Sequence, residues 1–367
     1  MITTCLIFWM PVSAALAELA ELDVRGGAED RPDEVHAATS SAPATTQAAS
    51  RIPRVTAMKA LCASCLAAGD EFVGRAVGLA QGSRRRPVNL AGGNVPNVDN
   101  GGVPPQIDTS KPHSARIYDY YLGGKDNFLA DRKTAIKAME AWPPIRMAAR
   151  ENRAFLGRVV RYLAEEAGIT QFLDLGSGLP GVGNVHEIAQ DVNPAARVVY
   201  VDNDPIVLAH GRALLTSTPA GKAVYIDADM REPEKILEHP VTRETLDFTK
   251  PVALIFIGIL HFFMADDEVR RIVEPLIDAV PSGSYVAAAH VTAEFAPAPT
   301  VKAGDVYTRS GVGIIGRDAD VFADLVFKGL TLVPPGVVVV SEWHPEPDAI
   351  LPARADVSIN GAVARKP

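Results

Sequence analysis

A glycine-rich turn directly after a short apolar stretch constrains the fold of this chain more than any other sequence feature. The stretch is QFLDLGSGLPGVG, at residues 171–183, and its apolar start is typical of a parallel strand buried on both faces. The glycines of the turn allow left-handed backbone conformations and let a ligand approach without a Cβ in its way. Asn184 and Glu187 then have the spacing of a helix N-cap and its capping box. A strand, a glycine turn and a helix in this order indicate the ligand-binding corner of an α/β sheet.

Two classes of cofactor compete for this corner. The spacing of Gly176, Gly178 and Gly181 fits the G-x-G-x-x-G pattern of dinucleotide-binding proteins. Asp174, however, lies two residues before the first glycine, where its negative charge would repel a pyrophosphate. A carboxylate at this position suits a cationic ligand, such as the amino group and sulfonium of S-adenosylmethionine. The sequence therefore favours Asp174, Gly176, Ser177 and Gly178 as part of an S-adenosylmethionine site.

An acidic residue also ends the next predicted strand. Asp202 closes the run RVVYVD, one strand–helix–strand unit after Asp174. A carboxylate at this place can accept hydrogen bonds from two ribose hydroxyls, with Asn203 beside it in support. Asp204 has a different expected role, because it precedes Pro205 and therefore fits the N-cap of the following helix.

Four motifs along the chain resemble those of a known family. They are IYDYYLGGKDNFLADR, DLGSGLPGVGNVHEIAQ, VVYVDNDPIVLAHGRALL and LHFF. In this order they are similar to motifs of the actinobacterial S-adenosylmethionine-dependent methyltransferase family once catalogued as a domain of unknown function. The resemblance covers residues 106–367. It implies a Rossmann-like class I methyltransferase fold in the α/β class, with a seven-stranded, mostly parallel sheet, a C-terminal antiparallel hairpin and an N-terminal helical lid. It does not indicate a methyl acceptor.

The same resemblance implies further cofactor-binding residues. Asp229 follows the third predicted strand and would contact the adenine amino group, in preference to Asp227, with turn capping as the alternative role. Met230 would flank the adenine ring. Tyr121 would belong to the lid, with core packing as the alternative role. Gly258, at the end of the fourth strand, would keep the approach to the sulfonium open.

His261 is the titratable side chain closest to the end of the fourth predicted strand, at residues 252–257. Two interpretations stay open. It can be the general base of methyl transfer, or it can pack over the adenine or bond to the backbone. Methyl transfer often needs no base, because in-line placement of the reactants supplies most of the effect.

The chain divides near residue 105. Residues 1–105 include Ala/Ser/Thr-rich low-complexity sequence, which we expect to form a disordered extension. Residues 106–168 contain three predicted helices and would form the lid, and residues 169–367 would form the sheet core. We expect a loop at the Ala- and Pro-rich residues 295–304. Residues 337–343 and 360–365 would pair at the end of the chain, giving one antiparallel strand at the sheet edge.

The composition of the chain restricts the classes of binding partner that we expect. The net charge of −8 gives no general field that attracts nucleic acid, so we expect a small-molecule substrate and no nucleic acid. The apolar residues 6–16 are too few to span a bilayer and lack a basic flank, so we expect no membrane association and a cytoplasmic location. All three cysteines lie in the first 65 residues, which excludes a thiol nucleophile from the catalytic region. We expect no metal, and the oligomeric state stays open.

The leading interpretation is an S-adenosylmethionine-dependent methyltransferase that acts on an unidentified, small-molecule acceptor by in-line displacement. Because the catalytic signal at His261 is weak, a non-catalytic protein that binds S-adenosylmethionine or S-adenosylhomocysteine is the alternative. An NAD-dependent oxidoreductase is favoured only by the bare glycine pattern.

Overall fold

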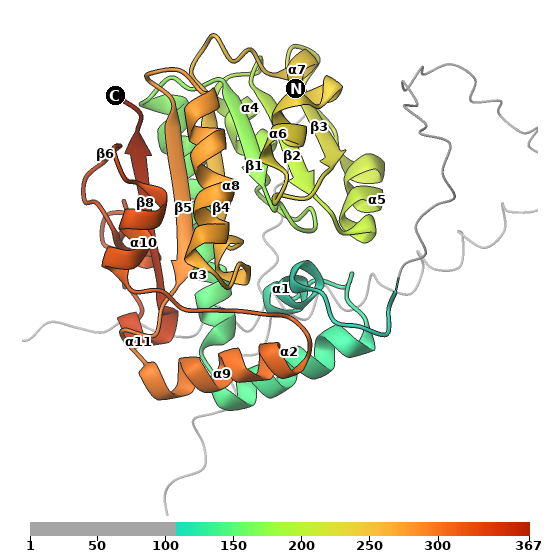
Figure 1. Cartoon of the computed structure of the whole chain (residues 1–367), viewed down its shortest axis with the longest axis vertical. Coiled ribbons are helices and arrows are strands. Elements are labelled where there is room, and N and C mark those ends of the chain that lie inside the picture. The colour runs from blue at the N-terminus through green and yellow to red at the C-terminus, as the bar shows by residue number, and fades with distance from the viewer. Residues whose placement is uncertain (1–107) are drawn as a thin grey trace, which may run out of the picture. The chain divides into compact units, whose positions relative to one another are not determined.

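The computed structural model of the chain describes residues 108–367. Its centre is one eight-stranded sheet with the order β3-β2-β1-β4-β5-β8-β6, in which β7 also pairs with β8 (Figure 1). The expected extension at residues 1–105 lies outside the described residues. The strands are β1 (Gln171–Leu175), β2 (Arg197–Asp202), β3 (Lys222–Asp227), β4 (Ala253–Ile257), β5 (Tyr285–Val291), β6 (Thr331–Leu332), β7 (Val338–Val339) and β8 (Ile359–Arg365).

The expected class I methyltransferase topology is confirmed, with one correction at the end of the chain. Strands β1 to β5 are parallel, and β8 runs antiparallel to β5. The predicted pairing of residues 337–343 with 360–365 is present as Val338 against Gly361. However, β8 is not the edge strand, because β6 and β7 cover its second side. These two-residue strands replace a single edge strand, and β8 is buried at every residue except Arg365.

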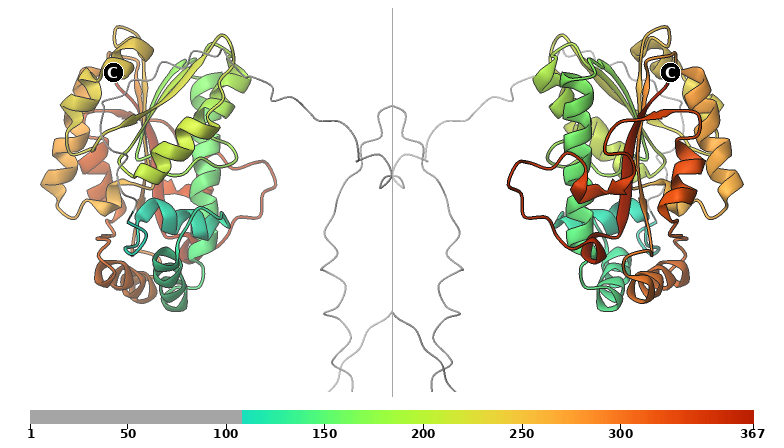
Figure 2. Two further views of the ribbon diagram at one scale, coloured as in Figure 1. Left: turned by 90° about the vertical axis from the view of Figure 1, so that its right-hand side faces the viewer. Right: turned by 90° about the vertical axis from the view of Figure 1, so that its left-hand side faces the viewer.

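Helices cover both faces of the sheet (Figure 2). Side chains of successive strand residues point to opposite faces, so Leu173 packs with α8 (Asp266–Ala279) and Phe172 packs with α3 (Ile145–Glu165). Continuous apolar runs in the sequence are the consequence, because each strand is buried on both sides. The other described helices are α1 (Ser114–Leu122), α2 (Leu129–Ala141), α4 (Val185–Val192), α5 (Pro205–Leu214), α6 (Pro233–Glu238), α7 (Pro240–Thr245), α9 (Pro297–Arg309), α10 (Ala319–Val326), α11 (Arg354–Val357) and the 3-10 turns η1 (Leu260–Phe262) and η2 (Val340–Glu342).

Three helices lie beyond the carboxyl ends of the parallel strands: α1, α2 and α9 (Figure 1). The prediction of a loop at residues 295–304 is wrong, because α9 occupies most of this segment. Pro297 and Pro299 fall in the first helical turn, where a missing N–H costs no intrahelical hydrogen bond. The Ala- and Pro-rich sequence, which predicts a loop, therefore forms the start of a helix.

Helix α3 takes part in two regions of the fold. Its first turns line the carboxyl-end cavity through Ala148 and Asn152, whereas Val159 and Leu163 pack against the sheet. The lid boundary at residue 168 therefore stays a prediction, since one helix serves both regions. No helix in the part of the chain that the structure describes is long and apolar enough to cross a membrane. The cytoplasmic location also stays a prediction.

Candidate active site

A cavity of about 650 Å³ lies at the carboxyl ends of the parallel strands. It spans the position between β1 and β4, where the strand order reverses, which is the usual ligand position in such sheets. Its volume is in the range of small-molecule sites. The residues predicted for the site all line it: Tyr121, Asp174, Gly176, Ser177, Gly178, Asp202, Asn203, Asp229, Met230, Gly258 and His261.

The glycine turn has the geometry that its sequence predicts. Gly176 has a φ of 70°, and a Cβ at this residue would lie 2.3 Å from Ile259 Cγ1. Gly178 has a φ of 68°, but a Cβ there would meet no atom within 4 Å. The first glycine is therefore required by packing against the segment after β4, whereas the second borders open space in the cavity.

Asp202 connects the glycine turn to the end of β2. Its Oδ2 accepts a 2.8 Å hydrogen bond from the Gly178 N–H, and its Oδ1 accepts one of 2.9 Å from the Asp204 N–H. A carboxylate has about four acceptor positions, so these two bonds leave capacity for a ligand. Its position is thus fixed by the backbone before any ligand binds.

Burial penalises the negative charges of the site. The Asp174 side chain is 7% exposed, and burial raises its pKa to about 7, with Arg153 acting against the shift and Asp202 adding to it. Burial also raises the pKa of Asp202. Because a cation beside Asp174 would relieve this penalty, the carboxyl end of β1 fits a positively charged ligand.

Asp204 holds the start of α1 against the end of β2. It caps α5 as expected, since its Oδ1 accepts a 2.9 Å hydrogen bond from the Ile206 N–H. Its Oδ2 lies 3.2 Å from Arg116 Nε and 3.0 Å from His113 Nδ1. Burial alone would raise the pKa of Asp204, but the bond to His113 and the nearby Arg116 bring it below its usual range. Sequence reasoning did not find this connection.

The acid after β3 that lines the cavity is Asp229, as preferred over Asp227, which is exposed and does not line it. Asp229 Oδ1 accepts a 2.9 Å hydrogen bond from the Arg231 N–H, so the alternative turn-capping role is also present. The neighbouring Met230 is buried and extends into the apolar cluster behind the sheet.

His261 is the middle residue of η1; it lines the cavity and is 8% exposed. Burial, together with the neighbouring His290 and Arg317, lowers its pKa well below the usual range, so the imidazole is neutral at physiological pH. Arg317 Nη1 lies 3.0 Å from His290 Nε2, and its Nε donates a 2.7 Å bond to Asp266. The Nδ1 atom of His261 finds no hydrogen-bond partner among the described residues.

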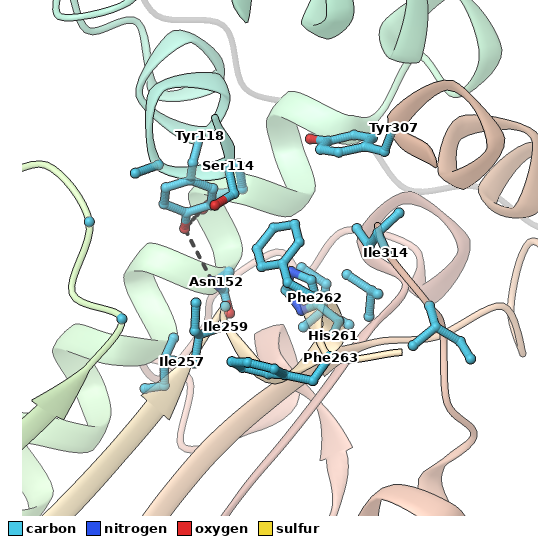
Figure 3. A pocket seen from close by; sticks show the side chains of 18 of the residues that line it. Ser114, Tyr118, Asn152, Ile257, Ile259, His261, Phe262, Phe263, Tyr307 and Ile314 are labelled. Atoms are coloured by element: carbon cyan, nitrogen blue, oxygen red, sulfur yellow. Dashed lines mark hydrogen bonds between the residues drawn. The ribbon is translucent and has the colours of Figure 1, made fainter. Parts of the chain in front are cut away.

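Two polar contacts between helices border the cavity, and Figure 3 shows the one between Tyr118 and Asn152. The Tyr118 hydroxyl donates to the Ala149 carbonyl over 2.9 Å and accepts a 3.1 Å bond from Asn152 Nδ2. The hydroxyls of Tyr121 and Tyr307 form a second bond between α1 and α9. Sequence reasoning missed Asn152, although a buried polar residue within the apolar face of a predicted helix is a usable signal.

A sheet of this order, with a glycine turn after β1 and acids at three strand ends, defines a class I methyltransferase. The chain belongs to the S-adenosyl methyltransferase family, which residues 100–367 match. This confirms the family expected from the motifs, the enzyme class and S-adenosylmethionine as the cofactor, and it excludes the oxidoreductase alternative.

Solved structures from actinobacteria agree with this assignment. A DUF574 family protein from Streptomyces avermitilis is 47% identical, with a TM-score of 0.69 over 71% of this chain and 100% of its own. A candidate methyltransferase from Thermobifida fusca is 44% identical, with a TM-score of 0.67 over 72% of this chain and 98% of its own. A comparison with curated proteins finds no match.

Proposed function

We propose that this methyltransferase acts on a small-molecule acceptor that binds beside the cofactor, in the part of the cavity between η1, α1 and α9. One observation supports this most. A single cavity connects the acidic ends of β1, β2 and β3 with the end of β4 and the aromatic side chains beyond it. Cofactor and acceptor can therefore meet without leaving the protein.

In this proposal the two ends of S-adenosylmethionine are recognised by different strand ends. Asp174, Gly176, Ser177 and Gly178 hold the methionine end. The open space next to Gly178 and the raised pKa of Asp174 support this placement, since a cation stabilises the ionised carboxyl.

The nucleoside lies over the ends of β2 and β3. Asp202 and Asn203 bind the ribose, while Asp229 and Met230 contact the adenine. The fixed orientation of Asp202 by two backbone N–H groups supports its role, because its free acceptor positions point to a defined place.

S-adenosylmethionine, when bound, would supply the methyl group for an in-line displacement in which the acceptor–carbon bond forms as the carbon–sulfur bond breaks. The residues of the chain position the reactants and exclude water. Gly258 leaves the end of β4 open, and Phe262 and Phe263 form an apolar wall (Figure 3). His261 is neutral and can accept a proton or orient the acceptor. Tyr121 closes the site from the lid side.

Calorimetry with S-adenosylhomocysteine tests the cofactor site. We expect saturable one-to-one binding to the wild-type chain and none of NADH. Transfer of a labelled methyl group to any small molecule in metabolite extracts would then exclude the non-catalytic alternative. The absence of S-adenosylhomocysteine binding would contradict the proposed site.

A further inference from the structure

The cavity has a second part whose chemistry differs from that of the cofactor side. We call it the outer part; it lies between η1, α1 and α9. Aromatic and aliphatic side chains form its walls, and four of them lie on or next to helices α1, α2 and α9. The main ones are Tyr121, Trp142, Phe262, Val301, Tyr307 and Ile314.

Two cations line the cavity, but both have acidic partners: Arg153 acts on Asp174, and Arg231, beside Phe263, pairs with Asp229 and Glu268. Asp305 lines the outer part, but this side chain is exposed and pairs with Arg309 at 3.4 Å. The buried acids of the cavity, Asp174 and Asp202, lie at the ends of β1 and β2 instead. A charged acceptor would thus lose its hydration without a buried partner among the described residues of the outer part. Flat aromatic molecules would gain from contact with the aromatic walls.

One buried polar atom at the border of the two parts, Asn152 Oδ1, lacks a hydrogen-bond partner within residues 108–367. Tyr118 gives its single hydroxyl hydrogen to the Ala149 carbonyl, so its oxygen must accept the bond from the Asn152 amide nitrogen. This fixes the orientation of the Asn152 carboxamide. Its Oδ1 is then buried and finds no hydrogen bond among the described residues.

Asn152 lies close to the carboxyl end of β4, where the methyl group would be transferred. A Cβ on Gly258 would lie 3.1 Å from Asn152 Nδ2, so the amide is next to the residue that directly follows β4. Both residues line the cavity, and Figure 3 shows Asn152 between Tyr118 and Ile259. A ligand N–H or O–H that reaches Oδ1 would remove the cost of a buried unpaired oxygen.

We infer that the methyl acceptor is an uncharged, planar molecule whose reacting atom carries a hydrogen, as an O–H or N–H group, and that Asn152 Oδ1 accepts the hydrogen bond of this group. The inference rests on the proposed function. In the reaction, the acceptor oxygen or nitrogen bonds to the methyl carbon while the carbon–sulfur electron pair returns to sulfur. The acceptor hydrogen leaves as a proton to solvent, and S-adenosylhomocysteine is the second product.

A series of naphthalene probes tests the acceptor class by calorimetry on the full chain saturated with S-adenosylhomocysteine. We expect 2-naphthol to bind about tenfold more tightly than 2-naphthoate and 2-naphthylmethylammonium. The affinity of 2-naphthol should also be about three- to tenfold higher than that of 2-methoxynaphthalene, which lacks the hydrogen-bond donor. Equal or tighter binding of a charged probe, or no binding of 2-naphthol, would overturn the inference.

Substitutions of Asn152 test the hydrogen bond. In Asn152→Ala, 2-naphthol should lose its advantage over 2-methoxynaphthalene, while S-adenosylhomocysteine affinity changes by less than about twofold. Asn152→Asp keeps the side-chain shape and should instead favour 2-naphthylmethylammonium. If either variant binds S-adenosylhomocysteine at least about tenfold more weakly but keeps the preference for 2-naphthol, Oδ1 serves the cofactor and the inference is wrong. If wild-type protein does not bind S-adenosylhomocysteine, the proposed function itself fails.

Discussion

Tyr121 and Tyr307 are 186 positions apart in the sequence, yet their hydroxyl oxygens lie 3.0 Å apart at the border of the cavity. The first belongs to α1 and the second to α9, so the bond joins a helix that precedes the sheet to one inserted after β5. Burial raises the pKa of both phenols, which therefore stay protonated and form a neutral pair. The cover of the cavity is thus assembled from two distant segments.

The tyrosine pair predicts a measurable coupling. Tyr121→Phe or Tyr307→Phe leaves one buried hydroxyl without its partner and should cost about 1 to 2 kcal/mol of unfolding free energy. The double variant should cost no more than about one single variant, because both hydroxyls are then gone. Urea unfolding measures all three. Tyr120→Phe is the control, since its ring keeps the contact with Arg146. Additive losses would show that the hydroxyls are not coupled.

Gly178 and Gly329 form a matched pair for the role of the glycine turn. Both have left-handed φ values, 68° and 78°, and a Cβ on either would meet no atom within 4 Å. Alanine at each should therefore cost about 1 to 2 kcal/mol of stability through backbone strain. Only Gly178→Ala should weaken S-adenosylhomocysteine binding, by at least about tenfold, because its Cβ enters the cavity. Equal affinities of the two variants in calorimetry would contradict the placement of the methionine end.

Asp202 and Asp227 provide a second comparison, since they are register neighbours at the ends of β2 and β3. Asp202→Asn replaces an acceptor of two backbone N–H bonds by an amide, which can accept only through its oxygen. We expect S-adenosylhomocysteine affinity to fall at least about tenfold. Asp227→Asn should leave it within about twofold, because this residue is exposed outside the cavity lining. Calorimetry on both variants checks this, and a similar loss in each would argue against the ribose role.

Cofactor binding should depend on pH through Asp174. Burial raises the pKa of this carboxyl to about 7, so protonation below that pH removes the charge that attracts the cationic ligand. S-adenosylmethionine affinity should rise by about tenfold per unit up to about pH 7 and then level off. Calorimetry from about pH 5.5 to about pH 8 measures the profile. Asp174→Asn should bind weakly with a flat profile, whereas a sloping profile in this variant would assign the titration to another group.

Asp174→Asn should raise the unfolding free energy of the protein in the absence of ligand. The folded state raises the Asp174 pKa from 3.8 to about 7, so it holds the proton more tightly than the unfolded chain. Stability that this group contributes at low pH is therefore lost as pH rises through about 7. The advantage of Asp174→Asn in unfolding free energy should grow by about 3 kcal/mol between about pH 5 and about pH 8. Thermal or urea unfolding at both pH values checks it, and a constant difference would contradict the pKa shift.

Local patterns in the sequence were sufficient for the parallel strands β1 to β5 and for the acids near their ends, whereas only Val338–Val339 of the strand expected at residues 337–343 is a strand. Leu173 and Asp174 illustrate this. A strand that is buried on both faces is apolar until it nears its carboxyl end, where a polar side chain can reach a ligand. Left-handed glycines after β1 are likewise a local requirement, confirmed at Gly176 and Gly178. These features depend on steric and burial constraints within a few residues.

Only the tertiary structure decided the features that depend on distant segments. Whether β8 lies inside the sheet depends on β6 and β7, and whether residues after Pro297 form a helix depends on their packing against α2. The orientation of Asn152 is set by Tyr118, and the pKa of Asp174 is set by burial. Desolvation and hydrogen bonding depend on which groups surround a residue in the folded protein. They therefore cannot be predicted from the residues next to it in the sequence.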